Sequence, residues 1–256
     1  MSDVFDPRGE GWTDRQRSAE PERLKDAPRR FYETATVAAA PAGFAVRLDG
    51  RPVRTPGRGL LTAPTREIAS GIAAEWDAQG ERIDPTTMPL TRLANTAIDG
   101  VADRMDEVRA DVVRYAGSDL LCYRAERPHG LVEREAAAWD PLLAWAAKDL
   151  RANFVLGQGI VHVAQPSEAL TRFANAVATV DTPFRVTGLH VMTALTGSAI
   201  VALAVTLGEL DVDSAWSAAH VEENWNIHQW GADEEAAARR AAREVDMRAA
   251  ALFALG

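Results

Sequence analysis

Residues 44–55 read FAVRLDGRPVRT, in which two short extended runs flank Asp49-Gly50. Phe44, Val46 and Leu48 alternate with other residues, which is the period of a strand with one buried face. Asp-Gly between two such runs is typical of a two-residue hairpin turn whose central residues both take positive φ. Further extended stretches are expected at residues 32–39, 52–55 and 60–62. This part of the chain is therefore predicted to be an antiparallel meander.

After residue 62 the spacing of apolar residues becomes helical. Ile68, Ile72 and Trp76 recur every four residues. Pro64 suits the first helical turn, and Gly80 is placed to end the helix. Residues 82–89 are interrupted by proline and are expected to be extended. We therefore predict one helix that closes the β region, followed by a linker.

The remaining chain has helical patterns. Apolar residues form one stripe over 105–115 and another over 132–150, where Pro141 predicts either a kink or two consecutive helices. Further helices are expected at residues 167–180, 183–195, 198–207, 212–229 and 232–254. The predicted fold class is α+β: a small N-terminal antiparallel β domain followed by a larger all-helical domain. The predicted boundaries are an irregular arm at 1–29, the β domain with one helix at 30–83, and the helical domain at 84–256.

The composition is globular and excludes several classes of partner. The chain has 256 residues, is 47% hydrophobic and carries a formal net charge of −9, which repels a nucleic-acid backbone. Cys122 is the single cysteine, so no intramolecular disulfide can form and a reducing compartment is indicated. Residues 1–30 lack the apolar region of a secretory signal, and nearly all basic residues are arginine, which is typical of a GC-rich bacterial genome. A bacterial cytoplasmic protein is expected.

One uncharged segment, residues 186–208, is long enough to cross a bilayer. Its threonines and glycines, and the sequence Thr196-Gly197-Ser198 near its centre, instead favour two buried helices joined by a turn. Stable insertion into a membrane is therefore not expected.

No pattern predicts catalysis, a cofactor or a metal. The glycine pairs at 57–59 and 157–159 lack the third glycine and the downstream acid of a dinucleotide site. His220 and His228 are eight residues apart, which is not the spacing of a zinc pair on one helix, even with Glu223 nearby. A binding surface is therefore the kind of functional site that remains.

The tryptophan-rich segment 216–231 is the most unusual part of the sequence. On a single helix, one line would hold Trp216, His220, Glu223, Ile227 and Trp230, with Trp225 on the opposite side. One interpretation is a partner-binding patch of aromatic and acidic side chains; the other is a helix buried on all sides. The nearby charges favour the patch. The candidate partner-binding residues are Glu222, Glu223, Glu234, Trp216, Trp225 and Trp230.

Several motifs together resemble one known family. They are LDGRPVRTP at 48–56, EWDAQ at 75–79, MPLTRLANTAID at 88–99, DLLCYRA at 119–125, WDPLL at 139–143 and WG at 230–231. In this order they resemble the assembly chaperones of F-type ATP synthase that protect the α subunit of the catalytic sector, in mitochondria and α-proteobacteria. The resemblance covers residues 31–235.

The resemblance implies a β domain followed by a helical domain, with no enzymatic activity and no cofactor. It also implies a functional acid shortly after Trp230-Gly231, which matches Glu234. Because the pattern departs from the family at Ala232-Asp233, Asp233 or Glu235 remain alternatives. Four residues are expected to be structural: Trp76, which the resemblance carries over, with Trp139, Asp49 and Gly50.

The expected function is that of a monomeric, ATP-independent chaperone. It would bind the unassembled α subunit of F-type ATP synthase and shield its apolar inter-subunit surface until assembly. The alternative is a small-molecule enzyme with a site at the junction of the two domains, using His190, His220 or Glu223. A third possibility is a structural subunit held permanently in a complex.

Overall fold

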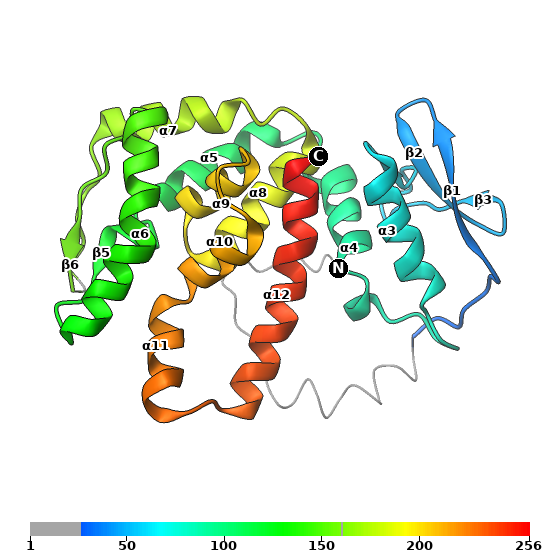
Figure 1. Cartoon of the computed structure of the whole chain (residues 1–256). Helices are drawn as coiled ribbons and strands as arrows, with labels where there is room; N and C mark the ends of the chain where they lie inside the picture. The colour runs from blue at the N-terminus through cyan, green and yellow to red at the C-terminus, as the bar shows by residue number, and fades with distance from the viewer. Residues whose placement is uncertain (1–26, 160) are drawn as a thin grey trace. The chain divides into compact units, whose positions relative to one another are not determined.

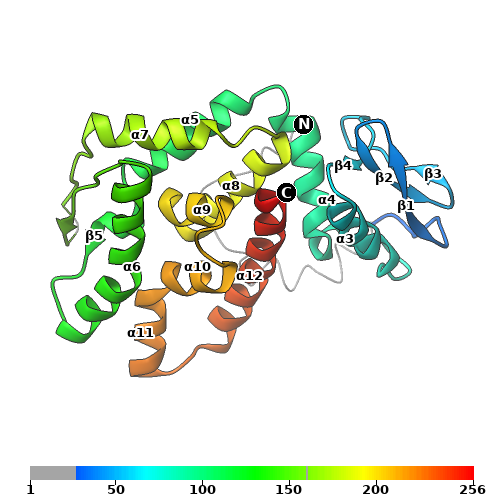
Figure 2. The same cartoon turned by 45° about the horizontal axis from the view of Figure 1, so that its top comes forward.

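The computed structural model describes residues 27–159 and 161–256, which form two compact units. The first unit ends at Asp103 and contains the main sheet, and the second spans Arg104–Leu255 and is mostly helical (Figures 1 and 2). The predicted fold class, a small N-terminal antiparallel β domain followed by a larger helical domain, is confirmed. The predicted arm at 1–29 lies outside the described residues except for its last three.

The sheet of the first unit is organised around β2 (Gly43–Leu48). Antiparallel partners of β2 are β1 (Ala35–Ala40), β3 (Arg51–Pro52) and β4 (Thr62–Ala63). The predicted hairpin is confirmed, because Leu48 pairs with Arg51 across Asp49 and Gly50, whose φ values are 47° and 78°. The carboxylate of Asp49 also accepts hydrogen bonds from the backbone N–H groups of Glu33 and Thr34. The turn residue therefore also fixes the start of β1.

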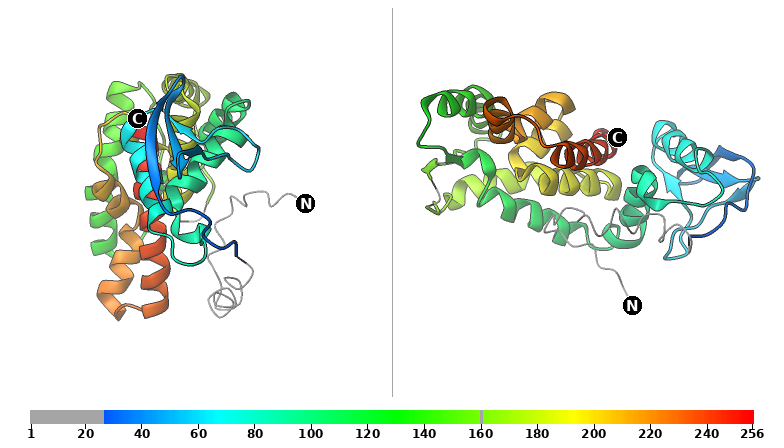
Figure 3. Two further views of the ribbon diagram at one scale, coloured as in Figure 1. Left: turned by 90° about the vertical axis from the view of Figure 1, so that its right-hand side faces the viewer. Right: turned by 90° about the horizontal axis from the view of Figure 1, so that it is seen from below.

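One helix covers one face of this sheet (Figure 3). It is α3 (Arg66–Asp77), capped by the side chain of Thr65, with Ile68 and Ile72 fully buried. Near the end of α3, the half-buried Trp76 packs against a small core made of Tyr32, Leu48, Ile83 and Met88. The predicted helix and its apolar stripe are confirmed.

The first unit extends beyond the boundary predicted at residue 83. It also contains the short helix η1 (Pro85–Thr87), α4 (Pro89–Thr96) and the π-helical turn η2 (Ala97–Val101). The carboxylate of Glu75 on α3 accepts hydrogen bonds from the N–H groups of Leu90 and Thr91 and from the Thr91 hydroxyl, at 2.6–2.8 Å. Because α4 begins on a side chain of α3, the division of the chain falls after Asp103.

The second unit contains eight α-helices and one short parallel strand pair within the described residues. The helices are α5 (Met105–Ala116), α6 (His129–Asp149), α7 (Ser167–Ala178), α8 (Pro183–Thr196), α9 (Ala199–Thr206), α10 (Val212–Ala219), α11 (Val221–Trp230) and α12 (Glu234–Leu255). The 3₁₀ turn η3 (Leu120–Cys122) leads into β5 (Tyr123–Arg124), which pairs with β6 (Gly157–Gln158). Pro141 lies inside α6, which remains one helix.

The uncharged segment forms the centre of this unit, as predicted. Gly197 takes a left-handed conformation (φ 67°) and turns the chain from α8 into α9, all of whose residues are buried. α8 also packs closely on α12, since a Cβ atom at Gly188 would lie 2.4 Å from the carbonyl oxygen of Ala250. No helix in the described ranges is both long and apolar enough to cross a membrane.

A buried carboxylate ties two parts of this core together. Asp119 is fully buried at the start of η3, and it accepts hydrogen bonds from the hydroxyl of Ser198 (2.7 Å) and the N–H of Ile200 (3.0 Å) at the start of α9. It also accepts one from the N–H of Leu121 (3.1 Å). Burial raises the pKa of this carboxyl to about 6 despite these donors.

The single helix predicted at 212–229 is wrong. α10 ends and α11 begins around His220, whose backbone (φ −117°, ψ 26°) departs from helical geometry. The side chain of His220 hydrogen-bonds through Nδ1 to the carbonyl oxygen of Trp216 (2.7 Å). This local bond offers the backbone an alternative to continuing the helix. Side chains on either side of the break therefore do not share one helical face.

Candidate functional site: the surface of α11 and the first half of α12

The segment of residues 221–246, which we call the α11–α12 surface, buries almost none of its side chains. In α11 only Val221 is buried, and in α12 the first buried residue is Met247. α11 packs against α6, whereas α12 packs against α8, α9 and α10. In Figure 1 these two segments extend away from the α8–α9 core. The α11–α12 surface thus presents two helices to solvent.

Trp230 is the most exposed large apolar side chain of the described residues. It is 78% exposed and ends α11 immediately before Gly231, whose φ of 87° turns the chain toward α12. Glu222 and Glu234 are also exposed. An exposed tryptophan near carboxylates is the composition expected of a contact surface, because Trp supplies large apolar area at low conformational cost.

The three acids that follow Gly231 differ in what they contact. The carboxylate of Asp233 accepts a hydrogen bond from the N–H of Glu235 (3.1 Å) and so caps α12. Glu235 forms an ion pair with Arg239 one turn later. Within the described ranges, Glu234 has no hydrogen bond or ion pair, so its carboxylate is the one available to a partner.

Trp225 lies between the surface and the body of the second unit. Its ring is half-buried, with the guanidinium of Arg134 on α6 4.9 Å from the ring centroid. A Cβ atom at Gly130 would lie 2.9 Å from the ring, so only glycine allows this approach. Trp225 therefore anchors α11 to α6 and offers a partner only part of its ring.

The prediction that Trp216 belongs to the exposed patch is wrong. It is only 5% exposed on α10, with its ring centroid 3.9 Å from that of His220. The helix break at His220 rotates α11 away from the line that Trp216 would have shared with Trp230. Glu223 is half-buried, and its carboxylate lies 3.8 Å from His220 Nε2. The structure therefore leaves Trp230, Glu222 and Glu234 as the exposed members of the candidate set.

Of the residues of the enzyme alternative, His220 and Glu223 lie together, whereas His190 contacts a different acid. His190 Nε2 is 3.7 Å from the carboxylate of Asp111, and burial lowers the pKa of His190. Burial is also the main cause that lowers the pKa of His220. In the described part of the chain, no group of three His, Cys, Asp or Glu side chains is placed to hold a metal. The catalytic combination that this alternative requires has no geometric support.

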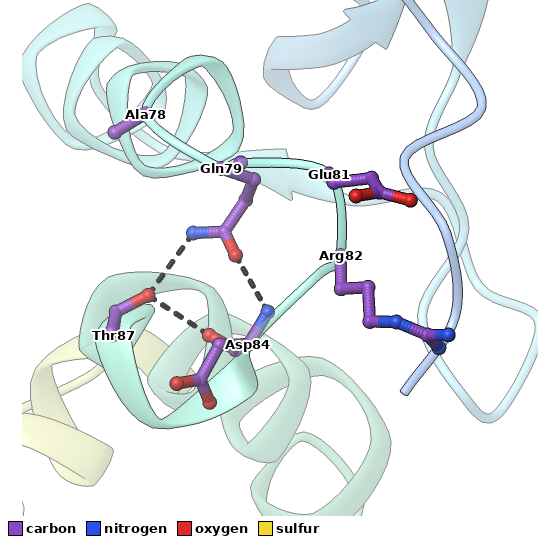
Figure 4. A pocket seen from close by; sticks show the side chains of 7 residues that line it. Ala78, Gln79, Glu81, Arg82, Asp84 and Thr87 are labelled. Carbon is purple, nitrogen blue, oxygen red and sulfur yellow. Dashed lines mark hydrogen bonds between the residues drawn. The ribbon is translucent and has the colours of Figure 1, made fainter. Parts of the chain in front are cut away.

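A pocket of about 410 Å³ lies in the first unit and does not involve those residues. It is lined by Ala78, Gln79, Gly80, Glu81, Arg82, Asp84 and Thr87 (Figure 4). Gln79 donates to the Thr87 hydroxyl (3.1 Å) and accepts from the N–H of Asp84 (2.6 Å). These polar groups satisfy one another, so the hydrogen bonds hold the loop between α3 and η1 in place.

Of the residues predicted to be structural, Trp139, Trp76 and Asp49 make contacts within the fold, and Gly50 lies in the hairpin turn. Trp139 is fully buried, and its Nε1 donates to the carbonyl oxygen of Ala218 (2.7 Å). Trp76 lies edge-on to Tyr32, with ring centroids 5.7 Å apart. Hydrogen bonds, first from the backbone of Thr34, lower the pKa of Asp49. The roles of Glu75 and Asp119 could not be predicted, because nothing in a single sequence distinguishes a buried capping carboxylate from a surface one.

Comparison with known proteins gives a consistent result. A family model described as ATP12 chaperone protein matches residues 29–147. The mitochondrial protein atp12 of Schizosaccharomyces pombe is 23% identical over 220 residues, covering 81% of this chain and 75% of the yeast protein.

Two similar crystal structures cover nearly all of the chain. A putative chaperone from Agrobacterium tumefaciens is 47% identical with a TM-score of 0.85, covering 96% of this chain and 92% of that one. Atp12 from Paracoccus denitrificans is 43% identical with a TM-score of 0.80, covering 90% and 98%. An aspartate-to-lysine variant of the Paracoccus protein has also been solved and matches equally well.

Proposed function

Because the chain belongs to the ATP12 family of ATP synthase assembly chaperones, we propose that it binds the unassembled α subunit of F-type ATP synthase. In this proposal it shields the apolar inter-subunit surface of that subunit until assembly. It acts in the bacterial cytoplasm as a monomer, without ATP, a cofactor or catalysis. The single observation that carries the proposal is the exposure of Trp230, together with the exposed carboxylate of Glu234, unpaired within the described residues, on the α11–α12 surface.

The physical requirement is for a surface that binds and then releases. An unassembled subunit exposes an interface that is large and apolar, and it aggregates unless this interface is covered. The cover must yield to the true partner, so a contact built from one or two apolar anchors with charges around them suits the task better than a continuous apolar face. Trp230 is such an anchor, and Glu222 and Glu234 supply the charges.

The geometry also supports the absence of chemistry in the proposal. Burial raises the pKa of the Cys122 thiol to about 12, which removes it as a nucleophile. His190 and His220 are buried in separate contacts, to Asp111 and to Trp216. The α11–α12 surface therefore provides area for contact with a partner and no catalytic group.

The test is light scattering of the isolated α subunit during dilution from denaturant, with and without the full chain. We expect the wild type to suppress aggregation at equimolar concentration, and W230A and E234K to suppress it poorly. E209K is the matched control, since Glu209 is an exposed acid in the turn between α9 and α10. Unchanged aggregation at excess wild-type protein would show that the α subunit is not the client.

A further inference from the structure

The sheet of the first unit carries a concentration of positive charge that has no role in the proposed function. Between Thr34 and Arg66 there are five arginines and a single acid, Asp49. The other residues hold the remaining 23 basic and 36 acidic side chains of the chain's totals of 28 and 37. A protein with a net charge of −9 therefore contains one distinctly basic region.

The strand register places arginines on the face of the sheet away from α3. Val46 is fully buried, so Arg47 beside it points to the opposite face, together with its pairing partner Pro52 on β3. Arg54 lies two residues beyond Pro52 and shares that face with its bridge partner Leu60, which is 45% exposed. Arg51 and Arg58 are exposed in the adjoining turns. We call Arg47, Arg51, Arg54 and Arg58 the sheet arginines.

Two acids that contact the sheet and its loop, Asp49 and Asp99, already accept hydrogen bonds from other groups. The carboxylate of Asp49 accepts from the backbone of Glu33 and Thr34. Asp99 accepts from the Thr55 hydroxyl (2.6 Å) and from the N–H of Gly57 (2.7 Å) in the loop before Arg58. Across residues 27–159 and 161–256, no carboxylate lies within ion-pair distance of any sheet arginine. Their charge is therefore not neutralised within the described chain.

The Arg54 guanidinium and the loop that leads to Arg58 are held in place before any partner binds. The guanidinium of Arg54 donates to the carbonyl oxygen of Arg58 (2.7 Å), and the loop between them is held by the contacts of Asp99. A guanidinium held in place loses less conformational freedom when it binds a carboxylate, and its planar fork suits that group.

The positive charge of the sheet arginines favours an anionic partner. The neighbouring side chains and the net charge of the chain decide whether that partner is a nucleic acid, a membrane or a polypeptide. Single-stranded nucleic acids need exposed aromatic rings for base stacking, and residues 34–66 present no exposed ring. A long phosphate backbone or an anionic membrane also extends past this face and meets the acidic remainder of a chain whose net charge is −9, which a short segment avoids. A short acidic polypeptide fits better, because carboxylates can pair with the arginines while apolar side chains contact Leu60.

We propose that the face of the sheet carrying Arg47, Arg54 and Leu60 is a second docking site, which binds an acidic segment of a partner protein. The site lies in the first unit and acts independently of the α11–α12 surface. It gives the chaperone a contact whose strength depends on ionic strength, since exposed pairs are screened by salt.

The experiment measures fluorescence anisotropy of a labelled oligoglutamate peptide titrated with the full chain at low salt. We expect saturable binding that weakens as salt is added. R47Q/R54Q should bind about tenfold more weakly, because two exposed ion pairs are lost. R47K/R54K keeps the charge and should retain most of the affinity. R104Q/R172Q removes two exposed arginines from the second unit and should bind like the wild type.

Several results would overturn this assignment. Equal affinity of R47Q/R54Q and R104Q/R172Q would show that the sheet arginines do not form the site. Tighter binding of oligothymidylate, or of phosphatidylserine vesicles, would assign the face to a nucleic acid or a membrane. A dimer of the wild type that R47Q/R54Q abolishes in sedimentation would assign it to a second copy of the chain. The assay contains no α subunit, so its failure would leave the proposed client to be judged by its own test.

Discussion

Replacing Asp119 with asparagine tests whether burial makes ionisation of this carboxyl less favourable in the folded chain than in the unfolded chain. The carboxyl is fully buried, and burial raises its pKa from the ordinary 3.8 to about 6. Because the pKa is higher in the folded state than in the unfolded chain, the folded chain binds more protons across this window. Stability from this group is fully present below about pH 4 and is lost as the pH rises through about 6.

The magnitude follows from the same two values. A difference of about two pKa units corresponds to roughly 3 kcal/mol over the whole window, of which about 2 kcal/mol appears between pH 7 and pH 4.5. Asparagine cannot titrate, so D119N lacks this term. It also places an NH₂ group among donors from Ser198, Ile200 and Leu121, and it should therefore be less stable than the wild type at both pH values.

The assay is urea unfolding of both proteins at pH 7 and pH 4.5, with free energies from linear extrapolation. Other carboxylates, including Glu75 and Glu135, also have pKa values raised mainly by burial, but they titrate in both proteins and cancel in the difference. We expect the destabilisation by D119N to be larger at pH 4.5 than at pH 7 by about 2 kcal/mol. Equal destabilisation at the two pH values would refute the argument that the carboxyl binds its proton more tightly in the folded chain.

Five further substitutions test the packing by chemical denaturation. W216A should cost about 3–5 kcal/mol because the ring is buried, whereas W230A should stay within about 0.5 kcal/mol; similar losses would contradict the assignment of core and surface. G188A should cost about 1–3 kcal/mol, because its Cβ would lie 2.4 Å from Ala250 O and 2.6 Å from Ala254 N; a neutral effect would show that α8 and α12 separate easily. G50A should cost about 1 kcal/mol through its φ of 78°, while G80A, with no atom within 4 Å and no positive φ, should cost less.

Local patterns predicted the parts of the fold that depend on neighbours in sequence. The Asp49-Gly50 hairpin and the 3.6-residue stripe on α3 follow from backbone preference and from the burial of one face. The uncharged segment could be predicted to form α8 and α9 because Gly197 supplies the left-handed turn between them.

The errors arose where a side chain bonds the backbone in a way that the apolar pattern does not show. The domain boundary moved because Glu75 caps α4 from a distance of fifteen residues along the chain. The helix at 212–229 broke because His220 bonds the backbone of Trp216, and this hid the indole that was expected at the surface. The sheet arginines were not recognised as a site, because only strand register shows that Arg47 and Arg54 share a face.

The near absence of burial in residues 221–246 has a consequence for how this surface can evolve. Since the free energy of folding is supplied by the body of the second unit, most positions here can be randomised without unfolding the protein, Val221 and Trp225 excepted. A library at Glu222, Ile227, Trp230 and Glu234 could thus be selected for new cargo. The binding specificity of this protein can therefore be changed without changing its fold.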